Sequence, residues 1–76
     1  MDRDYEYIRQ VLAQNLRKIR VHRNLSQEDL ALISDVHRTY VSQIERAVGN
    51  PSLLVLCKLA KTLETEPHLL LTKEAE

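Results

Sequence analysis

The sequence SQEDLALISDVHRTYVSQIERA, residues 26–47, decides the fold of this chain. Ser26 is a preferred helix-capping residue, and acidic residues follow it where the helix dipole favours negative charge, so we expect a short helix over about residues 27–33. The pattern then breaks, and inward-facing apolar residues spaced by three predict another helix over about residues 38–47. Two short helices flanking a turn of about four residues are typical of a helix-turn-helix.

Three further helices are expected around this pair. The first covers about residues 4–23, where apolar residues recur at helical spacing: Ile8, Leu12, Leu16 and Ile19. A capping serine and an apolar stripe predict a helix over about residues 52–63, and a proline suited to a first turn begins a last one over about residues 67–72. We therefore expect residues 1–76 to form one compact, all-α domain of five helices.

Length and composition agree with an all-helical chain. The 76 residues are 43% hydrophobic, with no Trp or Phe and a single Gly, so helices packed through aliphatic side chains are favoured over strands. Basic and acidic residues number 11 each, so the net charge by itself gives no support for a nucleic-acid partner. No apolar run approaches the roughly 20 residues that span a bilayer, and the N-terminus lacks the apolar stretch of a secretory signal. We expect a cytoplasmic protein without membrane contact.

Catalysis and cofactor binding are not expected from this sequence. The single Cys57 cannot form an internal disulfide or a metal cluster, and the three histidines lie on separate segments. No paired acid site and no glycine-rich phosphate loop occurs. A binding protein is therefore favoured over an enzyme.

The outer face of the helix expected over residues 38–47 carries groups that can read DNA bases. Arginine reads guanine through two parallel hydrogen bonds, glutamine can do the same with adenine, and a threonine methyl can contact the thymine methyl. The residues that project outward or stand at the entrance of this helix are His37, Arg38, Thr39, Ser42 and Gln43. The alternative is that they are ordinary solvated residues of a surface helix.

Four separated segments carry a resemblance to a known family: LRKIR (16–20), NLSQEDLA (24–31), YVSQIER (40–46) and NPSL (50–53). They resemble the Cro/cI-type helix-turn-helix family of phage and bacterial repressors. The resemblance implies a lambda-repressor-like fold and a sequence-specific transcriptional regulator that binds double-stranded DNA.

Within that family, the segment HRTYVSQIER (37–46) is similar to the controller proteins of restriction-modification systems. This similarity implies a homodimer on a pseudo-palindromic operator, which activates its own transcription and that of the endonuclease and represses at higher occupancy, with RNA polymerase as a further partner. Two alternatives stay open. One is a phage- or antitoxin-type repressor of the same fold, and the other is a protein-interaction module.

The resemblance also assigns roles outside the base-reading face. It implies contacts with the DNA backbone by Gln27, Arg46, Asn50 and Ser52, and an ion pair between Arg20 and Glu45 that braces the recognition helix. Tyr40, one position beyond Thr39, is a further candidate for contact with the DNA backbone. Gln27 and Ser52 stand at helix N-termini, where free N–H groups attract a phosphate. Ser52 can equally serve as a simple cap, and Tyr40 can pack against the helix over residues 27–33 or approach a dimer mate.

The sequence departs from the family pattern at three positions. Asn24 and Asp35 stand where glycine is usual, and both residue types tolerate the left-handed backbone better than most. His37 replaces the usual Ser or Thr cap, and it is a weak cap that can also contact a base or a phosphate. These departures leave the expected fold unchanged.

The C-terminal third holds more apolar residues than one helix stripe can bury. We expect some of them to form a dimer interface: Leu54, Val55, Cys57, Leu69, Leu70 and Leu71. The alternative is that the domain buries them all. Since one recognition helix covers only a few base pairs, two half-sites about one helical turn apart are expected.

Overall fold

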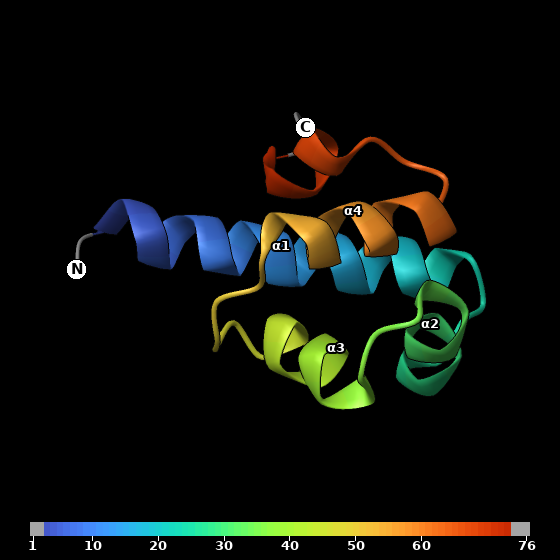
Figure 1. Cartoon of the computed structure of the whole chain (residues 1–76). Coiled ribbons are helices and arrows are strands. Elements are labelled where there is room, and N and C mark those ends of the chain that lie inside the picture. The colour runs from blue at the N-terminus through green and yellow to red at the C-terminus, as the bar shows by residue number, and fades with distance from the viewer. Residues whose placement is uncertain (1–2, 74–76) are drawn as a thin grey trace.

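Four α-helices and one short 3₁₀-helix make up residues 3–73, the part of the chain that the computed structural model describes. In chain order they are α1 (Arg3–His22), α2 (Gln27–Ser34), α3 (Arg38–Glu45), α4 (Leu53–Thr62) and the 3₁₀-helix η1 (Pro67–Leu71). α1 crosses the whole width of the molecule, with α2 and α3 below it and α4 and η1 above it (Figure 1).

The expectation of a fifth α-helix was wrong, because Pro67–Leu71 forms a 3₁₀-helix of five residues. Such a segment is shorter than an isolated α-helix needs, and its tighter i→i+3 bonding suits a short connector. The backbone N–H of Leu69 donates to the carbonyl of Glu66 at 3.0 Å, and Thr72 then takes an extended conformation. The described residues therefore support an all-α helix-turn-helix fold with four α-helices.

The core is made of aliphatic side chains contributed by every element. Seven residues have 0% exposure, and α1, α2, α3, α4 and the C-terminal segment all contribute: Leu16, Leu30, Val41, Leu59, Ala60, Leu63 and Leu70. Three apolar residues expected on the inward faces of their helices are exposed: Ile8, Ile33 and Leu53. Ile8 is 42% exposed on the part of α1 near the N-terminus, which extends beyond the other helices (Figure 1), and Ile33 is 61% exposed on the outer side of α2.

Each α-helix is followed within two positions by a residue in the left-handed backbone conformation, and none of these four residues is glycine. Asn24 and Asp35, with φ of 59° and 56°, confirm that these residues stand in for the usual glycines. Ala47 and Glu64 have φ of 58° and 56°, which the sequence did not reveal. At each site the next N–H reaches back to close the last turn; Leu25 N, for example, donates to Arg20 O at 3.1 Å. α3 therefore ends at Glu45, two residues before its expected end.

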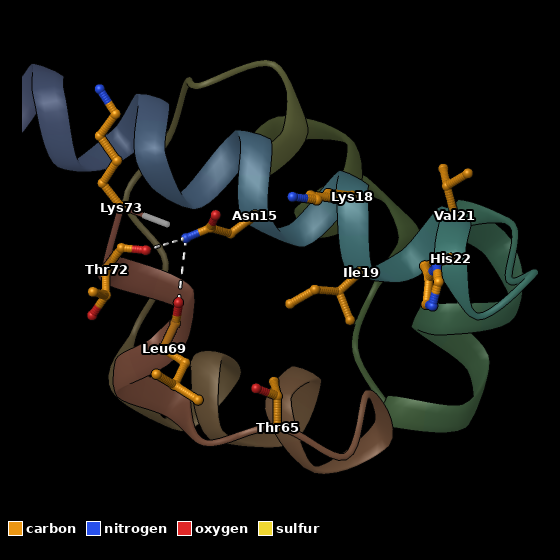
Figure 2. A pocket seen from close by; sticks show the side chains of 9 residues that line it. All are labelled: Asn15, Lys18, Ile19, Val21, His22, Thr65, Leu69, Thr72 and Lys73. Carbon is orange, nitrogen blue, oxygen red and sulfur yellow. Dashed lines mark hydrogen bonds between the residues drawn. The ribbon is translucent and has the colours of Figure 1, made fainter. Parts of the chain in front are cut away.

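Polar side chains join the elements on both sides of α1. The amide Nδ2 of Asn15 donates to the carbonyl of Leu70 at 2.9 Å. It also donates to the carbonyl of Thr72 at 3.0 Å and makes a longer contact of 3.3 Å with that of Leu69 (Figure 2). Ser34, the one buried polar residue among those described, donates its Oγ–H to Oγ1 of Thr62 at 2.7 Å. The first contact fixes η1 on α1, and the second fixes α2 on α4.

None of the helices described over residues 3–73 has the length and apolar character required to cross a bilayer.

Candidate nucleic-acid interface

α3 has one face in the core and one face in solvent. Val41 and Ile44 are buried at 0% and 3% exposure and hold the helix against the rest of the molecule. His37 is its N-cap, but the contact is weak, since the Nδ1 atom accepts the N–H of Thr39 at 3.4 Å. The helix is thus positioned mainly by packing, which leaves its outer face available for binding.

The five expected base-reading residues divide into two groups. His37, Arg38 and Thr39 are exposed at the start of α3, whereas Ser42 and Gln43 are half-buried one turn later. Gln43 lies beside the loop after α3, where a Cβ placed on Gly49 would meet Cβ and Oε1 of Gln43 at 3.5 Å. The first turn of α3 is therefore the part of the helix most open to a groove.

Arg20 and Glu45 are brought together across α1 and α3. Nε of Arg20 donates to Oε2 of Glu45 at 2.6 Å and Nη2 donates to Oε1 at 2.8 Å, while the side chains are 12% and 3% exposed. The pKa of Arg20 is raised above its ordinary value, chiefly by its hydrogen bond with Glu45, although burial acts in the opposite direction. The guanidinium therefore stays charged across the neutral pH range.

Gln27 belongs to the same network, which sequence reasoning did not anticipate. Its Nε2 donates to Oε1 of Glu45 at 3.1 Å, and Nη1 of Arg20 donates to the carbonyl of Leu25 at 2.8 Å. The network joins α1, the start of α2 and the end of α3 through one buried carboxylate. Gln27 is half-buried and its Nε2 is bonded to Glu45, so its expected contact with a phosphate would use other polar groups of this residue, such as its backbone N–H.

Three of the other residues expected to meet the DNA backbone lie around the two ends of the loop between α3 and α4. Arg46 and Asn50 are exposed, and Nε of Arg46 makes only a long contact of 3.4 Å to the carbonyl of Ser42. Ser52 caps α4, where its Oγ accepts the N–H of Val55 at 3.1 Å. Tyr40 lies in the first turn of α3 and exposes 48% of its surface.

A contact from α1 to this loop was missed by sequence reasoning. The hydroxyl of Tyr5 donates to the carbonyl of Gly49 at 3.1 Å, and the guanidinium of Arg9 lies 4.6 Å above the ring of Tyr5. The two bonded residues are 44 positions apart in the chain, so no local pattern could have revealed the contact.

The residues expected at a dimer interface do not share one environment. Leu54 and Leu69 are 65% and 46% exposed, and Cys57 is exposed as well. The expectation that Leu70 lies at the interface was wrong, because Leu70 is 0% exposed within the single chain and cannot contact a partner. Val55 and Leu71 are half-buried against the core. Leu53, which was not expected there, is 77% exposed on the first turn of α4.

A groove of about 810 Å³ lies between α1 and η1 (Figure 2). Its walls combine apolar and basic side chains, among them Ile19, Val21, Leu69, Lys18, His22 and Lys73. Because η1 and α3 lie on opposite sides of α1 (Figure 1), this groove is separate from the outer face of α3.

Comparison with known proteins extends the resemblance to most of the chain. The helix-turn-helix family matches residues 16–70. Control protein C.SmaI of Serratia marcescens is 48% identical over 67 residues, which cover 88% of this chain and 80% of that protein.

Solved structures agree with this relationship. The restriction-modification controller protein C.AhdI from Aeromonas hydrophila has a TM-score of 0.78 and 42% identity, and the match covers 82% of this chain and 94% of that one. SinR of Bacillus subtilis, a master regulator for biofilm formation solved in complex with DNA, has a TM-score of 0.76 and 32% identity, and the match covers 80% of this chain and 98% of that one. The chain therefore belongs to the helix-turn-helix family and is a relative of the restriction-modification controller proteins.

Proposed function

We propose that residues 1–76 form one DNA-binding domain that acts as a homodimer on a pseudo-palindromic operator and controls transcription in a restriction-modification system. The observation that carries this proposal is the exposed first turn of α3, where Arg38 and Thr39 stand clear of the core while Val41 and Ile44 anchor the helix. An α-helix of this kind fits the major groove, where side chains reach base edges.

Contacts with the DNA backbone would position α3 in the groove. Asn50 and Ser52 follow α3, while Gln27 opens α2, so the candidate phosphate contacts flank the recognition helix in the chain. Arg46 adds a charge that has no carboxylate partner among the described residues. Phosphate contacts set the register and orientation, and the exposed first turn of α3 then supplies the sequence preference.

A second copy of the chain would double the recognition surface. The exposed Leu53 and Leu54 of α4, together with Leu69 of η1, offer an apolar surface for it. A two-fold dimer uses the same patch on both copies and presents its two recognition helices to half-sites about one helical turn apart. The pseudo-palindrome in the operator follows from this symmetry.

The relationship to controller proteins supports a role in timing the transcription of the endonuclease gene. Such a regulator would activate its own transcription and that of the endonuclease, with RNA polymerase as its partner, and would repress at higher occupancy. Because its target is chromosomal or plasmid DNA in a bacterium, we expect it to act in the cytoplasm.

The test is a titration of the full chain on the DNA upstream of its own gene and on random DNA, with Arg38→Ala beside the wild type. We expect the wild type to prefer the upstream DNA, and Arg38→Ala to weaken that binding by roughly 1–3 kcal/mol while leaving random DNA little affected. A wild type that binds both DNAs equally would contradict the proposal, and so would an Arg38→Ala variant with full sequence preference.

A further inference from the structure

Arg9 is a half-buried arginine for which the described residues provide no acceptor. It lies on α1 one turn after Tyr5, with its guanidinium 4.6 Å above the ring of that tyrosine. Its Nε is shielded from solvent and makes no hydrogen bond. Arg20, on the same helix, has its guanidinium bonded to a carboxylate and a carbonyl. A shielded donor without an acceptor is costly, and the described residues bond no other nitrogen of this guanidinium, so Arg9 is available for an anion that they do not supply.

The position of Arg9 indicates which anion this is. Tyr5, on which Arg9 stacks, bonds through its hydroxyl to the carbonyl of Gly49 at 3.1 Å. Gly49 directly precedes Asn50, an exposed residue of the loop that we propose to meet the DNA backbone. The N-terminal half of α1 and this loop lie on the same side of the molecule (Figure 1). The guanidinium of Arg9 is therefore linked through Tyr5 to the loop that is proposed to meet the DNA backbone.

We infer that Arg9 is a further phosphate contact of the DNA-binding surface and that Tyr5 positions it. This inference rests on the proposed function. A guanidinium presents its donors in a planar fork that matches the oxygens of a phosphate, and the stacked ring fixes the direction of that fork before DNA arrives. In a chain with no net charge, each cation at the interface contributes a large part of the attraction for DNA.

The experiment compares the salt dependence of DNA binding among variants of the full chain. Arg9→Gln removes the charge, and Lys61→Gln removes one positive charge from an exposed site on α4 as the control. We expect Arg9→Gln to weaken binding to operator and random DNA alike, by roughly tenfold at 50 mM salt, and to lower the slope of log K against log salt by about 1 per protomer. Lys61→Gln should leave the slope within error of the wild type.

Two further variants separate a phosphate contact from a structural role. Arg9→Lys keeps a point charge, so it should retain most of the wild-type slope and lose only a few-fold in affinity. Tyr5→Phe keeps the ring but loses the bond to Gly49, so affinity should fall with the slope unchanged. Thermal unfolding of each variant is measured alongside, because a structural role would lower stability without changing the slope.

The outcomes distinguish this inference from the proposed function. If the wild type prefers its upstream DNA but Arg9→Gln binds with the wild-type slope, then Arg9 is not a phosphate contact and the proposed function stands. If Arg9→Lys loses the slope as completely as Arg9→Gln, the charge is not what matters and the inference is again overturned. If the wild type binds no DNA, both fail.

Discussion

Arg20 and Glu45 form a two-bond ion pair that ties α1 to the recognition helix, with N–O distances of 2.6 and 2.8 Å. The carboxylate also accepts a bond from Gln27 at 3.1 Å, so three helices depend on one side chain that is 3% exposed. Removal of either partner leaves a shielded charge without compensation. Loss of Arg20 therefore removes the link between α1 and α3, and loss of Glu45 also removes the bond to α2.

We predict that Arg20→Met lowers the free energy of unfolding by about 3 kcal/mol, because Glu45 is left charged and buried. Urea denaturation followed by circular dichroism measures the change. The matched control is Arg23→Met, which breaks the exposed pair of Arg23 and Glu64, whose side chains are 39% and 73% exposed, and should cost no more than about 0.5 kcal/mol. Equal costs for the two variants would show that burial of the pair does not matter.

We predict that Ala47→Gly stabilises the protein by about 0.5–1 kcal/mol. Ala47 has a φ of 58°, which crowds its Cβ, whereas glycine adopts this conformation freely and loses only part of the gain to the greater freedom of the unfolded chain. Gly49→Ala is the reverse test. Its φ is 83° and the added Cβ would make only ordinary contacts at 3.5 Å, so backbone strain alone should destabilise it by about 1 kcal/mol. Changes of the same sign in both variants would contradict this account.

We predict that Asn15→Leu loosens η1 from α1 at a cost of about 1–3 kcal/mol, since the carbonyls of Leu70 and Thr72 lose their donor. Hydrogen exchange should report the loss locally, as faster exchange of the backbone amides in η1 with little change in α2. Gln14→Leu, at the exposed neighbouring position, is the control. Unchanged exchange in η1 would mean that apolar packing alone holds the segment.

We predict that Leu54→Glu shifts the protein from dimer to monomer and weakens binding to a full operator by about tenfold or more, while binding to a single half-site changes little. Sedimentation velocity measures the mass. Leu32→Glu is the control, because Leu32 is 80% exposed but lies on α2, away from the proposed interface. If both variants are monomeric, or if both remain dimeric, the dimer interface does not lie at Leu54.

Much of the fold could be predicted because its signals are local. The cap at Ser26 is present, with its Oγ accepting the N–H of Asp29 at 2.9 Å, and the left-handed residues Asn24 and Asp35 end their helices as expected. Ala47 was predicted to be the last helical residue, but it takes a left-handed conformation two residues beyond the end of α3. Alanine is a good helix former, so its residue type gives no signal for that φ. Local preference therefore locates helix starts better than helix ends.

The parts that failed depend on contacts between distant segments. Residues 69, 70 and 71 are all leucine, so residue type does not distinguish them. The docking of η1 buries Leu70 and leaves Leu69 46% exposed. The bond from the amide of Gln27 to Glu45, 18 positions away, was not predicted, and the expected contact of Gln27 with a phosphate stays a prediction. Periodicity reports that a face is apolar or polar, but it does not report what that face meets.

The two faces of α3 also bear on how regulators of this kind diversify. Val41, Ile44 and Glu45 hold the helix, whereas Arg38 and Thr39 take no part in the core. On the proposed function, a duplicated gene can therefore acquire a new recognition sequence through substitutions at the codons of these exposed residues, while the buried residues keep the helix folded. Two such paralogous regulators can then act in one cell without binding each other's promoter. A mutant library confined to these codons would vary DNA specificity and leave folding intact.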